Sequence, residues 1–205
     1  MTTEIEIVNK ALYRLGAKPV TSTNGLISGI TETSLQSELA VNSYAILRDA
    51  VLEDRPWTIA MNRVILNADA SPPAFGYDQR FPVPSDCINV FRCDDGSGTY
   101  VIKWVREGAF VFADNTSTLY MEYIARLTDT NQYSNMFINC LSLRLAQEWC
   151  LAITESNGLA QSLMQEYQAM LIQASSSDGS QSRRELFRSR NLTAARNGGA
   201  PFMNL

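Results

Sequence analysis

The sequence predicts an α+β fold, in which an antiparallel α-helical bundle carries an inserted small antiparallel β-sheet domain and an extended C-terminal tail. Apolar residues recur at helical spacing near both ends of the chain, whereas short β-rich runs fill its middle. The segment 55–92 marks the change, because it holds five of the seven prolines together with several aromatic residues. We therefore expect a helical bundle domain of residues 1–57 and 127–174, an inserted β domain of residues 58–126, and an Arg-rich tail of residues 175–205.

Two helices are expected before the β domain. The first covers residues 3–15 and ends at Gly16, a residue type that favours the C-terminal cap. The polar loop 17–31 follows, and its length leaves two interpretations open, a mobile loop or a contact loop. The second helix is expected to begin near Thr33, which stands at capping-box spacing from Gln36, and to end before Pro56.

The β domain is expected to be one small antiparallel sheet. Its strands are separated by Gly-, Asp- and Asn-rich turns, of which 94–98 and 106–108 have hairpin composition. Pro82 and Pro84 lack backbone donors, so the stretch that contains them is expected at a sheet edge. The expected strands are 63–66, 81–83, 87–92, 100–106, 109–112 and 119–125.

Two further helices are expected after the β domain. The third, 133–154, is apolar on most sides, which suits a central core helix or a helix shared between the core and a subunit interface. Arg144 and Glu148 lie four positions apart on it, and we expect them to pair and to be candidates for a subunit interface. The fourth helix follows Asn157 and Gly158.

Four aromatic residues are candidates for the junction between bundle and insert, and two interpretations are open for them. They pack the inserted sheet onto the bundle, or they contact a partner directly. The four residues are Trp57, Phe75, Tyr77 and Phe81.

The composition argues against cofactor chemistry and against a membrane protein. The chain has no histidine, and its four cysteines follow no metal-ligand spacing, so we expect reduced thiols and no cofactor or metal. No apolar run approaches the roughly 20 residues that a membrane span needs. The net charge of −4 divides unequally, with +3 in residues 175–205 and −7 in the remainder. A basic tail on an acidic body suggests a negatively charged partner for the tail.

Three interpretations of the Arg-rich tail are open. It becomes ordered on a protein partner, it contacts DNA, or it stays solvated without a role. We favour the protein partner, because apolar anchors stand among the arginines. The residues assigned to this contact are Arg183, Arg184, Leu186, Phe187, Arg188, Arg190 and Phe202.

The order of these parts resembles the tail tubular protein A family, the head-to-tail adaptors of short-tailed bacteriophages. The resemblance covers residues 1–175, and its most distinctive portion is the P-x-D-C step at 84–87. The residues that carry it are IVNKALYRLG (7–16), AILRDAVLEDRPW (45–57), AMNRVIL (60–66), PPAFGYDQRFPVPSDCINV (72–90), the strand 119–125 and the helix from Tyr133.

This resemblance implies a structural, non-enzymatic protein of the virion tail that is assembled in the host cytoplasm. It implies a ring of twelve copies that sits under the portal protein and continues the DNA channel toward the tail nozzle protein. The genomic DNA would pass through without sequence-specific binding, and the tail residues named above would dock on the portal.

Two rival functions also follow from the residues. An envelope glycan hydrolase would need two carboxylates facing one cleft, for which Glu107, Asp114 and Glu122 are candidates. A DNA-binding module would use the Arg-rich tail.

Overall fold

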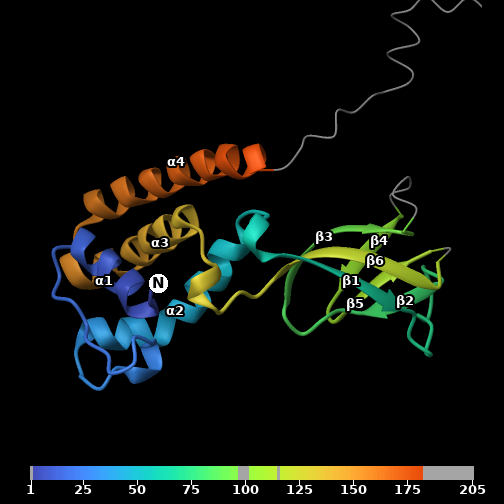
Figure 1. The fold of residues 1–205 in the computed structure, drawn as a ribbon, viewed down its shortest axis with the longest axis horizontal. Coiled ribbons are helices and arrows are strands. Elements are labelled where there is room, and N and C mark those ends of the chain that lie inside the picture. Colours follow the sequence, from blue (N-terminus) through green and yellow to red (C-terminus); the bar gives the residue numbers. More distant parts are fainter. Residues whose placement is uncertain (1, 97–101, 115, 182–205) are drawn as a thin grey trace, which may run out of the picture.

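The computed structural model describes residues 2–96, 102–114 and 116–181, and it has the predicted α+β architecture (Figure 1). A bundle of four α-helices forms one end of the molecule, and six short strands form the other. The helices are α1 (Glu4–Arg14), α2 (Leu35–Glu53), α3 (Asn135–Thr154) and α4 (Asn157–Gln181). Within the described part of the chain, no helix has the length and apolar character needed to cross a membrane.

The helices begin and end at local signals in the sequence. Thr3 and Glu6 form a capping box at the start of α1, and Gly16 follows its end with a φ of 66°. The predicted capping box of α2 was wrong by one position. Ser34 is the N-cap, and its hydroxyl accepts from the Ser37 amide at 3.2 Å.

The helix α3 is the centre of the bundle. It packs against α1, α2 and α4, and ten of its side chains are buried. A helix that is apolar on most sides lowers its free energy by contacting neighbours all round. The expectation of a core helix is therefore confirmed.

The insert contains two three-stranded antiparallel sheets, so the expectation of one sheet was wrong. The first has the order β1-β6-β3 and the second β2-β5-β4. Their inner faces share one apolar core, which includes Phe81, Val111 and Met121. The strands are β1 (Met61–Asn67), β2 (Gln79–Pro82), β3 (Cys87–Asp94), β4 (Trp104–Glu107), β5 (Phe110–Ala113) and β6 (Thr118–Ala125).

Two details of the insert agree with the sequence. The strand β2, which ends at Pro82, is an edge strand as its prolines require. The hairpin β4–β5 turns at Gly108, whose φ is 58°. The other predicted turn, 94–98, lies partly outside the described residues.

The insert meets the bundle through a small set of contacts. The guanidinium of Arg126, just after β6, donates to Asp49 on α2 at 2.7 Å. Ile124 of β6 packs in the bundle core. The two bodies consequently lie end to end rather than side by side (Figure 1).

The last helix is longer than expected. Residues 175–181 were assigned to the extended tail, but α4 continues to Gln181. Its inner stripe of Leu163, Tyr167 and Ala174 is buried against the core. Residues 182–205 lie outside the described residues.

Candidate interaction surfaces

A groove runs between α2 and the loop that precedes it. Two adjoining hollows of about 420 and 240 Å³ share Val41 as a common wall. The side chain of Val41 is 55% exposed although it is apolar. We call this surface the Val41 groove; its apolar lining is Leu26, Ile27, Ile30, Val41 and Ala45, and its acidic rim is Glu4, Glu32 and Glu38.

The loop wall of the Val41 groove is held in place by hydrogen bonds to α1. The side chain of Asn9 donates to the Val20 carbonyl at 3.0 Å and accepts from the Val20 amide at 2.8 Å. The carboxylate of Glu4 accepts from the amide of Ile27 at 2.9 Å. Because these bonds fix its backbone, the loop can present a defined surface, which favours the contact-loop interpretation.

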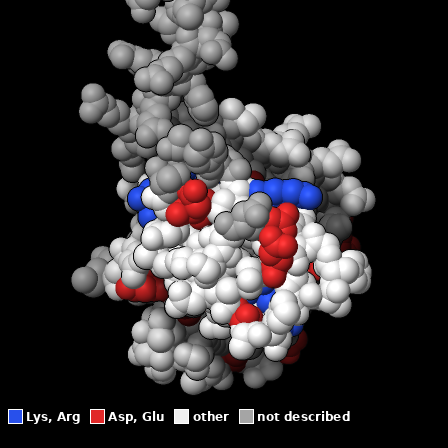
Figure 2. Space-filling view, turned by 90° about the vertical axis from the view of Figure 1, so that its right-hand side faces the viewer, with Lys and Arg blue, Asp and Glu red and all other residues white. Residues whose placement is uncertain are grey.

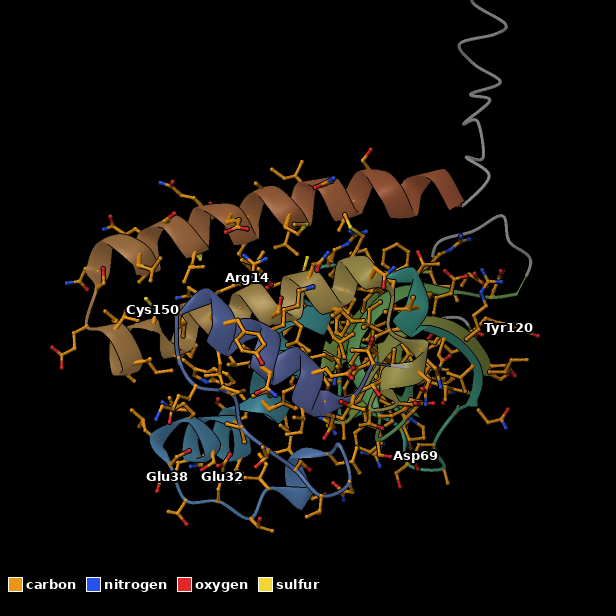
Figure 3. The ribbon with its side chains drawn as sticks, turned by 60° about the vertical axis from the view of Figure 1, so that its left-hand side comes forward. Arg14, Glu32, Glu38, Asp69, Tyr120 and Cys150 are labelled. Carbon is orange, nitrogen blue, oxygen red and sulfur yellow. The ribbon has the colours of Figure 1, made fainter. Side chains whose placement is uncertain are left out.

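The rim of the groove is acidic. Glu32 accepts from the Thr21 amide at 2.8 Å, and Glu38 forms no ion pair within the described residues (Figure 3). Arg48 is the single cation of the lining, but it is buried and pairs with Asp49 at 2.8 Å. The exposed charge at this surface is therefore negative.

A second apolar surface lies on α4, on the far side of α3 from α2 (Figures 1 and 3). Ile172 is 74% exposed and lies opposite the stripe that packs on α3. Met164 is also exposed on this helix. Arg14 of α1 pairs with Glu166 of α4 at 2.8 Å and helps to fix α4 on the bundle. We call this surface the Ile172 face.

A third surface lies on the outer side of the sheet β1-β6-β3. Ile65 and Tyr120 line a hollow of about 450 Å³ there, together with Glu122 and Arg63, which pair at 3.0 Å. Tyr120 lies at the end of the molecule farthest from the bundle's loop wall (Figure 3). Figure 2 shows this end, where side chains of both charges are set in a largely uncharged surface.

The four junction aromatics do not form one junction. Trp57 is buried in the bundle core, where it packs edge-on against Phe137 with ring centroids 5.1 Å apart. Phe81 is buried in the separate core of the insert. Tyr77 is half-buried beside Phe112 in the β2-β5-β4 sheet, at a centroid distance of 6.2 Å.

Phe75 contradicts the packing interpretation directly, because its side chain is 89% exposed. The ring belongs to neither of the two apolar cores. An exposed aromatic is instead compatible with the other interpretation, direct partner contact.

The predicted ion pair between Arg144 and Glu148 was wrong. Arg144 donates to Gln147, and its guanidinium lies 6.0 Å from the ring centre of Tyr167 on α4. Glu148 is exposed and forms no ion pair in the described part of the chain. The aromatic ring and the neighbouring amide attract the guanidinium toward α4, where it contributes to packing between α3 and α4.

The remaining predicted residues divide into two groups. Arg183, Arg184, Leu186, Phe187, Arg188, Arg190 and Phe202 lie outside the described residues. The hydrolase candidates are described, and they are not brought together: Glu107 and Asp114 lie at opposite ends of the β4–β5 hairpin, and Glu122 lies in the other sheet.

The buried titratable groups are placed for stability. Burial raises the pKa of the Cys93 thiol to about 12 and that of Cys140 to about 11, so neither is a thiolate near neutral pH. All four cysteines are free thiols, as expected, and only Cys87 is partly exposed. The carboxylate of Asp86 accepts from the Tyr123 hydroxyl at 3.3 Å. In the part of the chain that the structure describes, no cluster of potential ligands is arranged for a metal ion.

Comparison with known proteins adds no relative from which a site could be transferred. No protein-family model matches the chain, and no curated protein matches it. The surfaces described above and the resemblance of residues 1–175 to the adaptor family are the features that bear on function.

Proposed function

We propose that this chain is a structural virion protein, a head-to-tail adaptor that forms a ring between the portal and the tail nozzle. The observation that carries this proposal is the presence of two unlike apolar surfaces on opposite sides of one bundle, the Val41 groove and the Ile172 face. A heterologous contact joins two different surfaces, and repeated around an axis it closes a ring when the rotation fits. The resemblance to the adaptor family implies twelve copies.

The side contact would derive its energy from apolar burial. Burying an exposed Val or Ile side chain contributes about 1.5–3 kcal/mol, so a few such residues per interface are substantial. Ile46 is a further exposed apolar residue of α2, on a different side of the helix from Val41. Each copy makes this contact twice in a closed ring, which multiplies its effect on assembly.

The end-to-end arrangement of bundle and insert suits the axial contacts of an adaptor. A ring of such subunits offers a bundle layer and a β layer, one facing the portal and the other the nozzle. Portal docking is assigned to Arg183, Arg184, Leu186, Phe187, Arg188, Arg190 and Phe202 in the Arg-rich segment. The net charge of −7 in the rest of the chain would weaken phosphate binding and let DNA pass.

Substitution of Ile172 by glutamate tests the side contact. We expect Ile172→Glu to abolish ring formation on purified portal protein, because it places a charge in an apolar interface, while far-ultraviolet circular dichroism stays unchanged. Gln173→Glu is the matched control, since it adds the same charge to an exposed position of the same helix that points about 100° away from Ile172. If Ile172→Glu forms rings of normal stability, the Ile172 face does not make the side contact, and the proposal loses the observation that carries it.

Deletion of residues 182–205 tests portal docking separately. We expect the shortened chain to retain its helical and sheet content, since every described element precedes the deletion. Its binding to portal protein should be weakened at least tenfold in a co-sedimentation assay. Undiminished binding would show that the bundle or the insert, rather than this segment, contacts the portal.

A further inference from the structure

We propose that Phe75 of one copy inserts into the hollow on the outer side of the sheet β1-β6-β3 of a neighbouring copy. This inference rests on the proposed ring and names the contact that joins its inserts side by side. The partner of this surface is therefore a second copy of the chain.

The chemistry of the hollow suits an aromatic side chain. Its lining includes Ile65, which is 59% exposed although it is apolar, and the exposed ring of Tyr120. The side chain of Arg63 is 80% exposed, although it pairs with Glu122. An incoming aromatic ring can pack edge-on or offset against the tyrosine and can receive the guanidinium on its face. A cavity of about 150 Å³ holds a benzene molecule, so a hollow of about 450 Å³ has room for the ring of Phe75.

The loop that carries the exposed ring is held at its base. The amide of Asp69 donates to the carbonyl of Arg80 at 2.8 Å, and the two side chains pair at 3.0 Å. Tyr77 is half-buried against the sheet β2-β5-β4. Pro72 and Pro73 restrict the backbone just before the ring. Because the loop is ordered in advance, insertion of its ring loses little conformational entropy.

The loop and the hollow lie in one layer of the ring. Rotation about the ring axis keeps every residue at its own height, so a side contact joins only surfaces of the same layer. In the hollow, Ile65 near the end of β1 lies opposite Tyr120 near the start of β6. The loop follows directly from the end of β1, and Figure 1 shows it directed across the long axis of the molecule. Both features therefore belong to the end of the insert farthest from the bundle.

The loop and the hollow also lie on different sides of the insert. In Figure 3, Asp69 at the base of the loop lies well below Tyr120, and this direction is across the long axis of the molecule. The side chain of Phe75 is 89% exposed, so it does not fill the hollow of its own chain. A heterologous contact between them repeats from copy to copy, and it adds side contacts in the insert layer to those proposed for the bundle.

Thiol cross-linking in the full chain tests this assignment. We combine Ile65→Cys with Phe75→Cys, mix the protein with portal, treat it with a short bis-maleimide, and separate the products by denaturing electrophoresis. The bis-maleimide bridges the space that the missing phenyl ring leaves. The same reaction is carried out on the concentrated protein without portal. Val41→Cys with Phe75→Cys is the matched control, because Val41 is about as exposed as Ile65 but belongs to the bundle.

We expect a ladder of covalent oligomers from the Ile65 pair and none from the Val41 pair or the unmodified chain. Absence of a ladder in both conditions, a ladder of equal yield from the Val41 pair, or an internally cross-linked monomer as the sole product would overturn the proposal. Electron microscopy of the same samples distinguishes it from the adaptor proposal. Rings on portal without a ladder would contradict the insert contact alone, whereas a ladder without rings on portal would support the insert contact and contradict the adaptor.

Alanine substitutions give an independent measurement. Phe75→Ala and Ile65→Ala are each expected to raise the protein concentration that half-fills the rings on portal by about threefold or more. The double variant should be little worse than either single one, because both remove the same contact. Phe91→Ala, which removes an exposed aromatic residue of β3 outside the hollow, should leave this concentration unchanged. Unchanged concentrations for both single variants, or an equal rise for Phe91→Ala, would contradict the proposal.

Discussion

Trp57 should be the most sensitive aromatic residue of the proline-rich segment. Its side chain is fully buried, and its indole N–H donates to the Val51 carbonyl at 2.7 Å. That carbonyl is among the last four of α2, which have no partner inside the helix. Trp57 also contacts Phe137 of α3 edge-on, so it packs the C-terminal end of α2 against α3.

We expect Trp57→Ala to lower the free energy of unfolding by about 3–5 kcal/mol, the cost of emptying a large core site. Trp57→Phe should cost about 1–3 kcal/mol, because it retains most of the ring but leaves the Val51 carbonyl buried and unpaired. Phe75→Ala is the control from the same segment. Its exposed ring predicts a change within about 0.5 kcal/mol.

Urea denaturation followed by far-ultraviolet circular dichroism measures all three variants against the unmodified chain. A loss below about 1 kcal/mol for Trp57→Ala would mean that the indole does not fill the core as described. A loss above about 2 kcal/mol for Phe75→Ala would mean that this ring is packed rather than exposed. Either result would contradict the assignment of Trp57 to the buried core and of Phe75 to the surface.

Three further predictions concern the rest of the molecule. The free energy of unfolding should fall between about pH 9 and 12, because Cys93 stays protonated in the folded chain and ionises when the chain unfolds. The expected slope is roughly 1.4 kcal/mol per pH unit for one buried thiol. Urea unfolding at several pH values measures this slope, and Cys93→Ala should reduce it. Gly96→Ala should cost about 1 kcal/mol or more in thermal unfolding, since φ is 83° and a Cβ would lie 2.5 Å from the Tyr120 ring; no change would contradict this contact. Asn9→Ala should accelerate hydrogen exchange in the loop 17–31 without unfolding α3, and unchanged exchange would show that the loop is held by other bonds.

The helices could be predicted because their signals are local. Thr3 with Glu6, Gly16 and Pro56 each act within one turn of the helix end they define. The cap of α2 was misplaced by one residue because Thr33 and Ser34 both carry a suitable hydroxyl. Ser34 is the N-cap because its backbone is extended just before the helix, and this conformation depends on the preceding loop.

The sheets and surfaces depend on contacts between distant residues, which local patterns do not contain. The strand β6 pairs with β1 and β3, so Glu122 lies opposite both Arg63 and Arg92, and no short-range signal divides the six strands into two sheets. One wall of the Val41 groove is the loop 17–31, which Asn9 of α1 holds in place through two hydrogen bonds to Val20. Helical spacing places Val41 on the same side of α2 as the buried Ser37 and Arg48, so the sequence alone does not show that its side chain is exposed.

The most direct test of the adaptor proposal is electron microscopy of the purified protein mixed with the portal protein proposed as its partner. We predict closed rings of twelve copies stacked coaxially on the portal, with the subunits in side-by-side contact through α2 and α4. Portal particles without any added ring, at protein concentrations well above those needed for assembly, would contradict the central claim.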